Sequence, residues 1–202
     1  MKFTAKGPVV LASASPRRSE LLAMLGIEFT VNPSLKDEPN PADYQTAMGY
    51  VIECARLKAK DIAKHHPESV VIGSDTVVVL DGEILLKPKS REEAVDFLTR
   101  LSGRTHDVIT AVSIIKSASE ESFHELTQVT FYDLPEAWIN AYVDTEDPYD
   151  KAGAYGIQTV SGLFVEKING DYNAVVGLPI AKLVQKLSLS GYIRIEGSRV
   201  EC

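Results

Sequence analysis

Short apolar runs alternate with amphipathic segments along most of this chain. Runs with the character of strands lie at residues 9–12, 70–80 and 108–115, and weaker ones at 29–32, 123–131 and 164–168. Apolar positions at helical spacing lie at residues 16–25, 43–64, 91–101, 135–145 and 179–187. Strands and helices alternate at first, and several strands follow one another in the middle. The pattern therefore predicts a mixed α/β sheet with helices on its faces.

The segments between these runs define turns and a tail. Asp81-Gly82 separates two short apolar runs and predicts a β-hairpin. Residues 117–122 are polar and predict a loop. We expect one domain of two closely packed lobes at residues 1–189, followed by a loosely held tail at residues 190–202.

The composition narrows the class of protein. The chain has 202 residues, of which 45% are hydrophobic, enough for a sizeable core, and a formal net charge of −7, which argues against nucleic-acid binding. Cys54 and Cys202 make neither a disulfide framework nor a metal cluster, which favours a reducing compartment such as the cytoplasm. Residues 1–8 lack the apolar core of a signal peptide. No apolar run approaches the roughly 18 residues of a membrane helix, so we expect no membrane association.

Two adjacent arginines begin the first predicted helix. Arg17 and Arg18 follow Pro16 at its N-terminus, where cations are locally unfavourable by roughly 0.3–1 kcal/mol each. A bound phosphate would offset this cost, since free N–H groups, Ser hydroxyls and guanidinium groups all donate to phosphate. The alternative is a pair of solvated arginines that form surface ion pairs.

Asp75 interrupts the long apolar run at residues 70–80. A buried carboxylate is costly unless it is paired or binds a metal, so Asp75 is a candidate cation ligand or general base. The alternative is a turn in which Asp75 accepts from a backbone N–H. In the helix predicted at residues 43–64, Lys58 falls inside the arc of apolar positions. Either Lys58 extends to the surface, or it reaches an anion in a cleft.

A third segment, residues 150–158, combines small residues with a Lys, a Tyr and Gln158. Its glycines permit close approach of the backbone to a ligand, and a Gln amide offers a donor beside an acceptor, which suits the edge of a nucleobase. The alternative is an ordinary glycine-rich loop.

Together these segments resemble the Maf family of nucleoside triphosphate pyrophosphatases. The matching segments occur in family order and span the chain from about residue 9 to 187; they lie at residues 11–18, 55–59, 73–76, 86–88, 101–104 and 151–158. The resemblance implies an α/β fold like that of inosine triphosphate pyrophosphatases, with two lobes around a long, curved mixed sheet and a central cleft. It also implies a homodimer and a housekeeping role in nucleotide metabolism.

The resemblance also assigns roles to individual residues. It implies that Asp75 is the catalytic base and that Glu38 and Asp75 hold a divalent metal. Asp37 is the alternative to Glu38, because the polar loop at residues 34–38 has few landmarks. Substrate contacts are implied for Ser13, Arg17, Arg18, Lys58, Thr76, Lys87 and Gln158. The subgroup that acts on dTTP and UTP is marked by three of these, namely Arg17, Thr76 and Gln158.

These roles agree with the chemistry of the residues. A nucleoside triphosphate carries about four negative charges, which the four cations and a divalent metal can balance. Carboxylates such as those of Asp75 and Glu38 suit Mg²⁺ or Mn²⁺. The expected reaction is attack of water on the α-phosphorus with pyrophosphate as the leaving group. The expected activity is therefore that of a nucleoside triphosphate diphosphatase.

Three other functions compete with this one. Phosphoryl transfer through an aspartyl phosphate at Asp75 calls for a second Asp two residues on, where this chain has Val77. A P-loop NTPase is disfavoured because the chain lacks a Gly-Lys-Ser/Thr motif. The third alternative is a non-catalytic nucleotide sensor that regulates cell division or septum formation.

Overall fold

The computed structural model describes residues 2–196. Its main sheet has the strand order β3-β2-β4-β6-β7-β8, and β5 pairs with the far end of β4. The strands are β2 (Val9–Leu11), β3 (Thr30–Val31), β4 (Val70–Leu80), β5 (Glu83–Leu85), β6 (Thr105–Lys116), β7 (Ser119–Phe131) and β8 (Val165–Asn169). Because β2 is parallel to β3 and β4 whereas the other neighbours are antiparallel, the predicted mixed sheet is confirmed.

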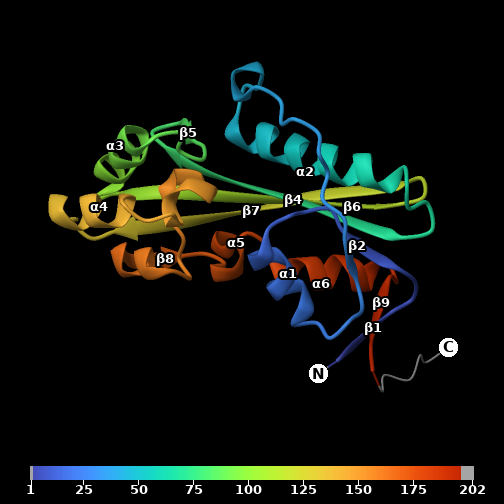
Figure 1. Ribbon diagram of the computed structural model, residues 1–202. Helices are drawn as coiled ribbons and strands as arrows, with labels where there is room; N and C mark the ends of the chain where they lie inside the picture. Colours follow the sequence, from blue (N-terminus) through green and yellow to red (C-terminus); the bar gives the residue numbers. More distant parts are fainter. Residues whose placement is uncertain (1, 197–202) are drawn as a thin grey trace.

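Three long antiparallel strands, β4, β6 and β7, run through the whole molecule (Figure 1). The loop predicted at residues 117–122 is wrong: β6 and β7 form a hairpin in which Lys116 pairs directly with Ser119. The connecting turn has Ser117 at a φ of 53°, and polar residues of β7 that face solvent produced the loop-like pattern. Asp75 pairs with Ala111 inside the β4–β6 ladder, which excludes a turn at that position.

One lobe surrounds the end of the sheet that contains β2. Helix α2 (Ala47–Ala63) packs on one face, where Ala55 and Ala59 contact the sheet, while α1 (Pro16–Ala23) and α6 (Ile180–Leu189) cover the other face (Figure 1). The prediction begins α2 at residue 43, but Pro41–Asp43 form a short 3-10 helix. Thr46 then caps α2 by accepting from the N–H of Gly49.

The second lobe surrounds the other end of the long strands. Helices α3 (Arg91–Leu101) and α4 (Glu136–Val143) pack with β5 around a buried apolar cluster. This cluster includes the rings of Phe131, Tyr155 and Phe164, and Phe131 contacts the other two edge to face. Three short 3-10 helices lie between α4 and β8: η2 (Asp147–Asp150), η3 (Ala152–Ala154) and η4 (Val160–Phe164). The chain returns to the first lobe through the short helix α5 (Tyr172–Val176).

Part of the predicted tail belongs to the fold. Strand β9 (Ile193–Ile195) pairs antiparallel with β1 (Phe3–Ala5), and Ile193 is buried against the first lobe. The expectation of a loosely held tail is therefore wrong for this strand, and residues 197–202 lie outside the described part of the chain. Within residues 2–196, no helix is long and apolar enough to cross a membrane.

Candidate active site

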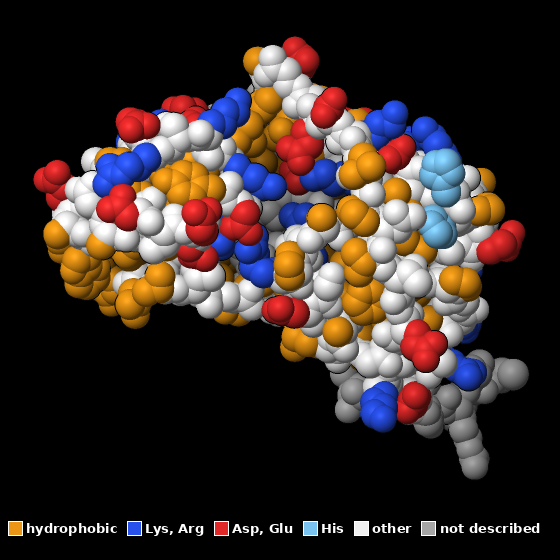
Figure 2. Space-filling model, in the orientation of Figure 1, with side chains coloured by type: hydrophobic (Ala, Val, Ile, Leu, Met, Phe, Trp, Pro, Cys, Tyr) orange, Lys and Arg blue, Asp and Glu red, His pale blue; other side chains and the backbone are white. Residues whose placement is uncertain are grey.

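A cleft of about 580 Å³ lies between the two lobes, at the level where β2 ends and β4 passes from one lobe to the other. All nine residues that the sequence assigns to the site line it: Ser13, Arg17, Arg18, Glu38, Lys58, Asp75, Thr76, Lys87 and Gln158. Figure 2 shows acidic and basic side chains gathered around this hollow near the centre of the visible face. The structure thus brings together residues that are far apart in the sequence.

The cleft contains Arg18, which lies in the first turn of α1. Its Nε donates to the carbonyl oxygen of Gly177 at 2.8 Å, its Nη1 to Ser13 Oγ at 3.1 Å and its Nη2 to Thr76 Oγ1 at 3.0 Å. Burial lowers the pKa of the Arg18 guanidinium, against the opposing charge of Asp75. Three neutral acceptors therefore hold Arg18 in place, and its remaining N–H groups are available to an anion.

Lys58 bridges the two carboxylates of the site. Its Nζ lies 2.6 Å from Asp75 Oδ1 and 2.6 Å from Glu38 Oε1. Of the two alternatives that the sequence left open for Lys58, the structure shows the one in which it reaches into the cleft, with its side chain only 16% exposed. Glu38, rather than the alternative Asp37, is the carboxylate of the polar loop that reaches Lys58.

A glycine permits this arrangement. A Cβ atom on Gly73 would lie 2.3 Å from the carbonyl oxygen of Ala55 and 2.8 Å from the backbone nitrogen of Ala59. Since the backbone of α2 approaches β4 this closely, Lys58, one turn along the same helix face, can reach Asp75 on the strand.

The two carboxylates have different electrostatic surroundings. Burial raises the pKa of Asp75 above its ordinary value, although the charges of Lys58 and Arg18 oppose this. For Glu38, burial is outweighed by the charge and hydrogen bond of Lys58, helped by Lys87, so its pKa is lowered. Two neighbouring carboxylates whose pKa values move in opposite directions are typical of an active site.

The remaining predicted residues form the walls. Thr76 Oγ1 lies 2.9 Å from Thr110 Oγ1 on β6, which fixes its position beside Arg18. Lys87 follows β5 at the rim, and Gln158 enters from the segment between η3 and η4. Cations, hydroxyls and one amide therefore line the same cleft.

Sequence reasoning missed a group of residues around Arg17. Arg17 Nη1 forms an ion pair with Asp150 Oδ2 at 3.2 Å, and Asp150 in turn contacts the buried Lys151. Asp150 and Lys151 belong to the glycine-rich segment noted in the sequence, but no local signal indicates that this segment faces the start of α1. Lys36 and Lys89 also line the cleft and carry no local signal of their own.

Comparisons with known proteins identify the family of this chain. A family model described as "Maf-like protein" matches residues 8–189. The chain belongs to the Maf family. A "dTTP/UTP pyrophosphatase" of Exiguobacterium sibiricum is 47% identical to this chain over 186 residues, which cover 91% of this chain and 93% of that protein. A "dTTP/UTP pyrophosphatase" of Bacillus pumilus is 47% identical over 188 residues, which cover 91% of this chain and 96% of that protein.

Among solved structures, the Staphylococcus aureus Ham1 protein is similar to this Maf-family chain with a TM-score of 0.45 and 18% identity. The similarity covers 62% of this chain and 72% of that protein.

Proposed function

We propose that this Maf-family protein hydrolyses dTTP and UTP to the nucleoside monophosphate and pyrophosphate. The observation that supports this most is the contact of Lys58 with the buried Asp75 and the more exposed Glu38, in a cleft that also contains Arg18 and Lys87. The names of the Exiguobacterium and Bacillus relatives support the choice of substrate.

The carboxylates of the cleft fit a divalent metal. Within residues 2–196 no group of three or more His, Cys, Asp or Glu side chains forms a metal site by itself. Mg²⁺ is commonly held by one or two carboxylates together with substrate phosphates, and Asp75 and Glu38 each have one oxygen that Lys58 does not contact. We assign these two residues to Mg²⁺ or Mn²⁺, which would neutralise charge on the phosphate oxygens.

The side chains of the site account for the remaining chemistry. Asp75, as general base, would take a proton from the water that attacks the α-phosphorus, and Lys58 holds its carboxylate in a fixed orientation. Arg18 and Lys87 would stabilise charge on the phosphates and on the departing pyrophosphate. In the metal-free cleft, burial raises the pKa of Asp75 above that of an ordinary Asp, and a bound cation would favour its ionised form.

Gln158 accounts for the preference for thymine and uracil. Both bases present an acceptor O4 beside a donor N3–H, which an amide can satisfy with its N–H and its C=O. Cytosine reverses this pattern, so it leaves polar groups unpaired when the amide is held in one orientation.

One assay tests this function. The purified protein is incubated with dTTP, UTP, CTP, ATP or GTP and Mg²⁺, and release of pyrophosphate is measured. We expect release from dTTP and UTP, and we expect Gln158→Glu to reduce both rates more than it weakens binding of inorganic pyrophosphate. Tight nucleotide binding without release would instead support the sensor, and equal rates with all five nucleotides would contradict the role of Gln158.

We also propose that the enzyme acts as a homodimer in the cytoplasm. Light scattering of the purified protein tests the dimer, and fractionation of the source cells tests the location.

A further inference from the structure

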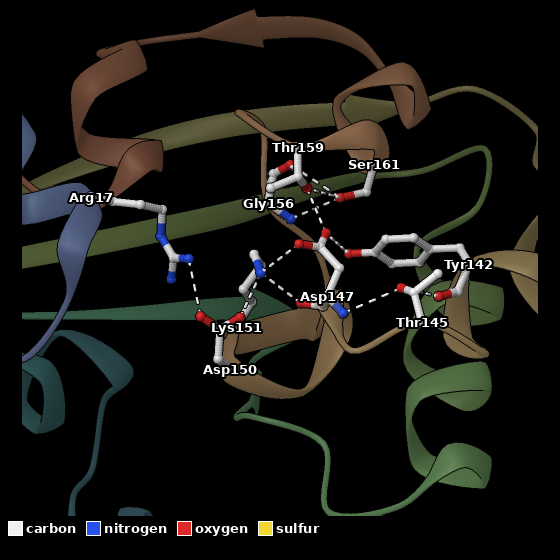
Figure 3. A network of polar contacts seen from close by, with 9 residues as sticks. All are labelled: Arg17, Tyr142, Thr145, Asp147, Asp150, Lys151, Gly156, Thr159 and Ser161. Atoms are coloured by element: carbon white, nitrogen blue, oxygen red, sulfur yellow. Dashed lines mark hydrogen bonds and ion pairs between the residues drawn. The ribbon is translucent and has the colours of Figure 1, made fainter.

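A continuous polar network links the two walls of the cleft (Figure 3). It begins at Arg17 on α1, whose Nη1 contacts Asp150 Oδ2 at 3.2 Å. The other oxygen of Asp150 accepts from Lys151 Nζ. Lys151 Nζ also donates to Asp147, to Oδ1 at 3.0 Å and to the carbonyl oxygen at 2.6 Å. Arg17 in the first lobe is thus connected to η2 in the second lobe.

The far end of this network holds the segment that carries Gln158. Asp147 Oδ2 accepts from Thr159 Oγ1 at 2.6 Å and from the hydroxyl of Tyr142 at 2.8 Å. The hydroxyl of Ser161 accepts from the N–H of Gly156 at 3.0 Å, and Ser161 Oγ lies 3.0 Å from Thr159 Oγ1. Thr159, at one end of the 156–159 turn, is therefore bonded directly to Asp147, and Gly156, at the other end, is linked to it through Ser161 and Thr159.

Lys151 also supports this turn by packing. A Cβ atom on Gly156 would lie 2.7 Å from Lys151 Cε, so the backbone of the turn rests directly on the aliphatic part of the lysine. The Lys151 side chain is 7% exposed. A displacement of Lys151 would consequently move both Asp150 and the turn before Gln158.

The charges of the network alternate and balance. Partial burial opposes ionisation of Asp150, but the hydrogen bond and charge of Lys151, and then Arg17, lower its pKa. The pKa of Asp147 is also lowered: hydrogen bonds from Thr159, Tyr142 and Lys151 outweigh its burial. Both carboxylates are ionised at neutral pH and neutralise the two cations. Arg17 thus differs from Arg18, whose direct partners are neutral.

We propose that Asp150, acting with Lys151 and Asp147, is a positioning residue that sets Arg17 against the Gln158 turn and so determines which base the cleft accepts. This inference rests on the proposed function and deepens it. Because its charge is already balanced, Arg17 contributes a hydrogen-bond donor at a fixed place rather than additional attraction for phosphate. A displacement of this donor changes the fit of the base more than it changes the binding of the triphosphate.

The exposure of Asp150 separates this role from a structural one. Its side chain is 60% exposed, and exposed ion pairs contribute little to stability. Asp150→Asn keeps the size of the side chain and removes the charge that orients Arg17. Asp144→Asn is a matched control: Asp144 is 62% exposed, lies on the same lobe and accepts from Arg91 Nε at 2.8 Å.

The experiment compares UTP with CTP in two ways. Equilibrium binding is measured by calorimetry in the absence of metal, and kcat/KM is measured with Mg²⁺, for the wild type, Asp150→Asn, Asp144→Asn, Arg17→Ala and the double variant Arg17→Ala/Asp150→Asn. We expect Asp150→Asn to reduce the UTP-to-CTP ratio about tenfold in both measurements, as for one misplaced hydrogen bond to a base. We expect its melting temperature to stay within about 2 °C of the wild type.

The double variant decides whether Asp150 acts through Arg17. We expect Asp150→Asn to have no further effect on the UTP-to-CTP ratio when Arg17 is Ala, and we expect Asp144→Asn to leave the ratio at the wild-type value. An unchanged ratio in Asp150→Asn, equal loss with and without Arg17, or equal wild-type binding of UTP and CTP would overturn the proposal. A different result would contradict only the proposed function: the protein releases no pyrophosphate, but the ratio of its UTP and CTP binding constants still depends on Asp150.

Discussion

The close approach of α2 to β4 at Gly73 predicts a large effect of a single methyl group. In Gly73→Ala the new Cβ would lie 2.3 Å from the carbonyl oxygen of Ala55, whereas ordinary contacts begin near 3.4 Å. The helix must therefore retreat by about 1 Å, because both atoms that it meets first belong to the backbone. Because Lys58 lies on this helix, its 2.6 Å contact with Asp75 would be weakened by the retreat.

Two quantities measure this change. Overpacking against backbone should cost about 3 kcal/mol, which lowers the melting temperature by roughly 6–12 °C for a chain of this length. A shift of about 1 Å of Lys58 away from the catalytic carboxylate should reduce kcat for UTP by about 100-fold. Calorimetry gives the melting temperatures. A pyrophosphate-release assay gives kcat, at a temperature well below the melting temperatures of both the wild type and the variant.

Gly49→Ala is the matched control. It adds the same methyl group to the exposed start of α2, where the nearest atom is Thr46 Oγ1 at 3.2 Å. Removing a glycine from a helix gains about 0.5–1 kcal/mol, so this variant should be as stable as the wild type or slightly more stable, with unchanged activity. If Gly73→Ala matched Gly49→Ala in both measurements, the distance between α2 and β4 would not control the site.

Three further substitutions test other parts of the site and the core. Asp75→Asn should reduce turnover by about 10²–10⁴-fold while nucleotide binding, measured by calorimetry, stays largely intact; substantial remaining turnover would exclude Asp75 as the base. Arg18→Ala should weaken nucleotide binding and also lower the free energy of unfolding by about 1–3 kcal/mol, because it removes the hydrogen bonds to Ser13, Thr76 and Gly177; unchanged denaturant unfolding would show that these contacts are not stabilising. Burial lowers the pKa of His106 from 6.5 to about 4. As the pH falls, the imidazole of the unfolded chain is therefore protonated before that of the folded protein. The free energy of unfolding of the wild type should consequently decrease by about 3 kcal/mol between pH 6.5 and 4. His106→Gln should remove that part of the pH dependence in denaturant titrations, and parallel curves for the two proteins would contradict it.

Local pattern alone predicted most of the secondary structure. The bounds of β4 and α3 agree with those predicted, because continuous apolar runs and helical periodicity are properties of neighbouring residues. Errors arose where distant segments decide the structure. The polar residues after Lys116 form a strand because β6 offers a complete partner, and β9 is ordered because β1 lies beside it.

The site shows the same division. Residue type and spacing identified the candidates: a carboxylate within a buried run, a lysine on the apolar arc of a helix and paired arginines at a helix start. Only the tertiary structure decided that Glu38 rather than Asp37 meets Lys58, that neutral acceptors hold Arg18, and that Asp150 faces Arg17. Sequence alone determines which chemical groups are available and which element carries them, since both depend on neighbouring residues. Their partners depend on how the two lobes close around the long strands, and the many contacts between residues distant in sequence determine that closure.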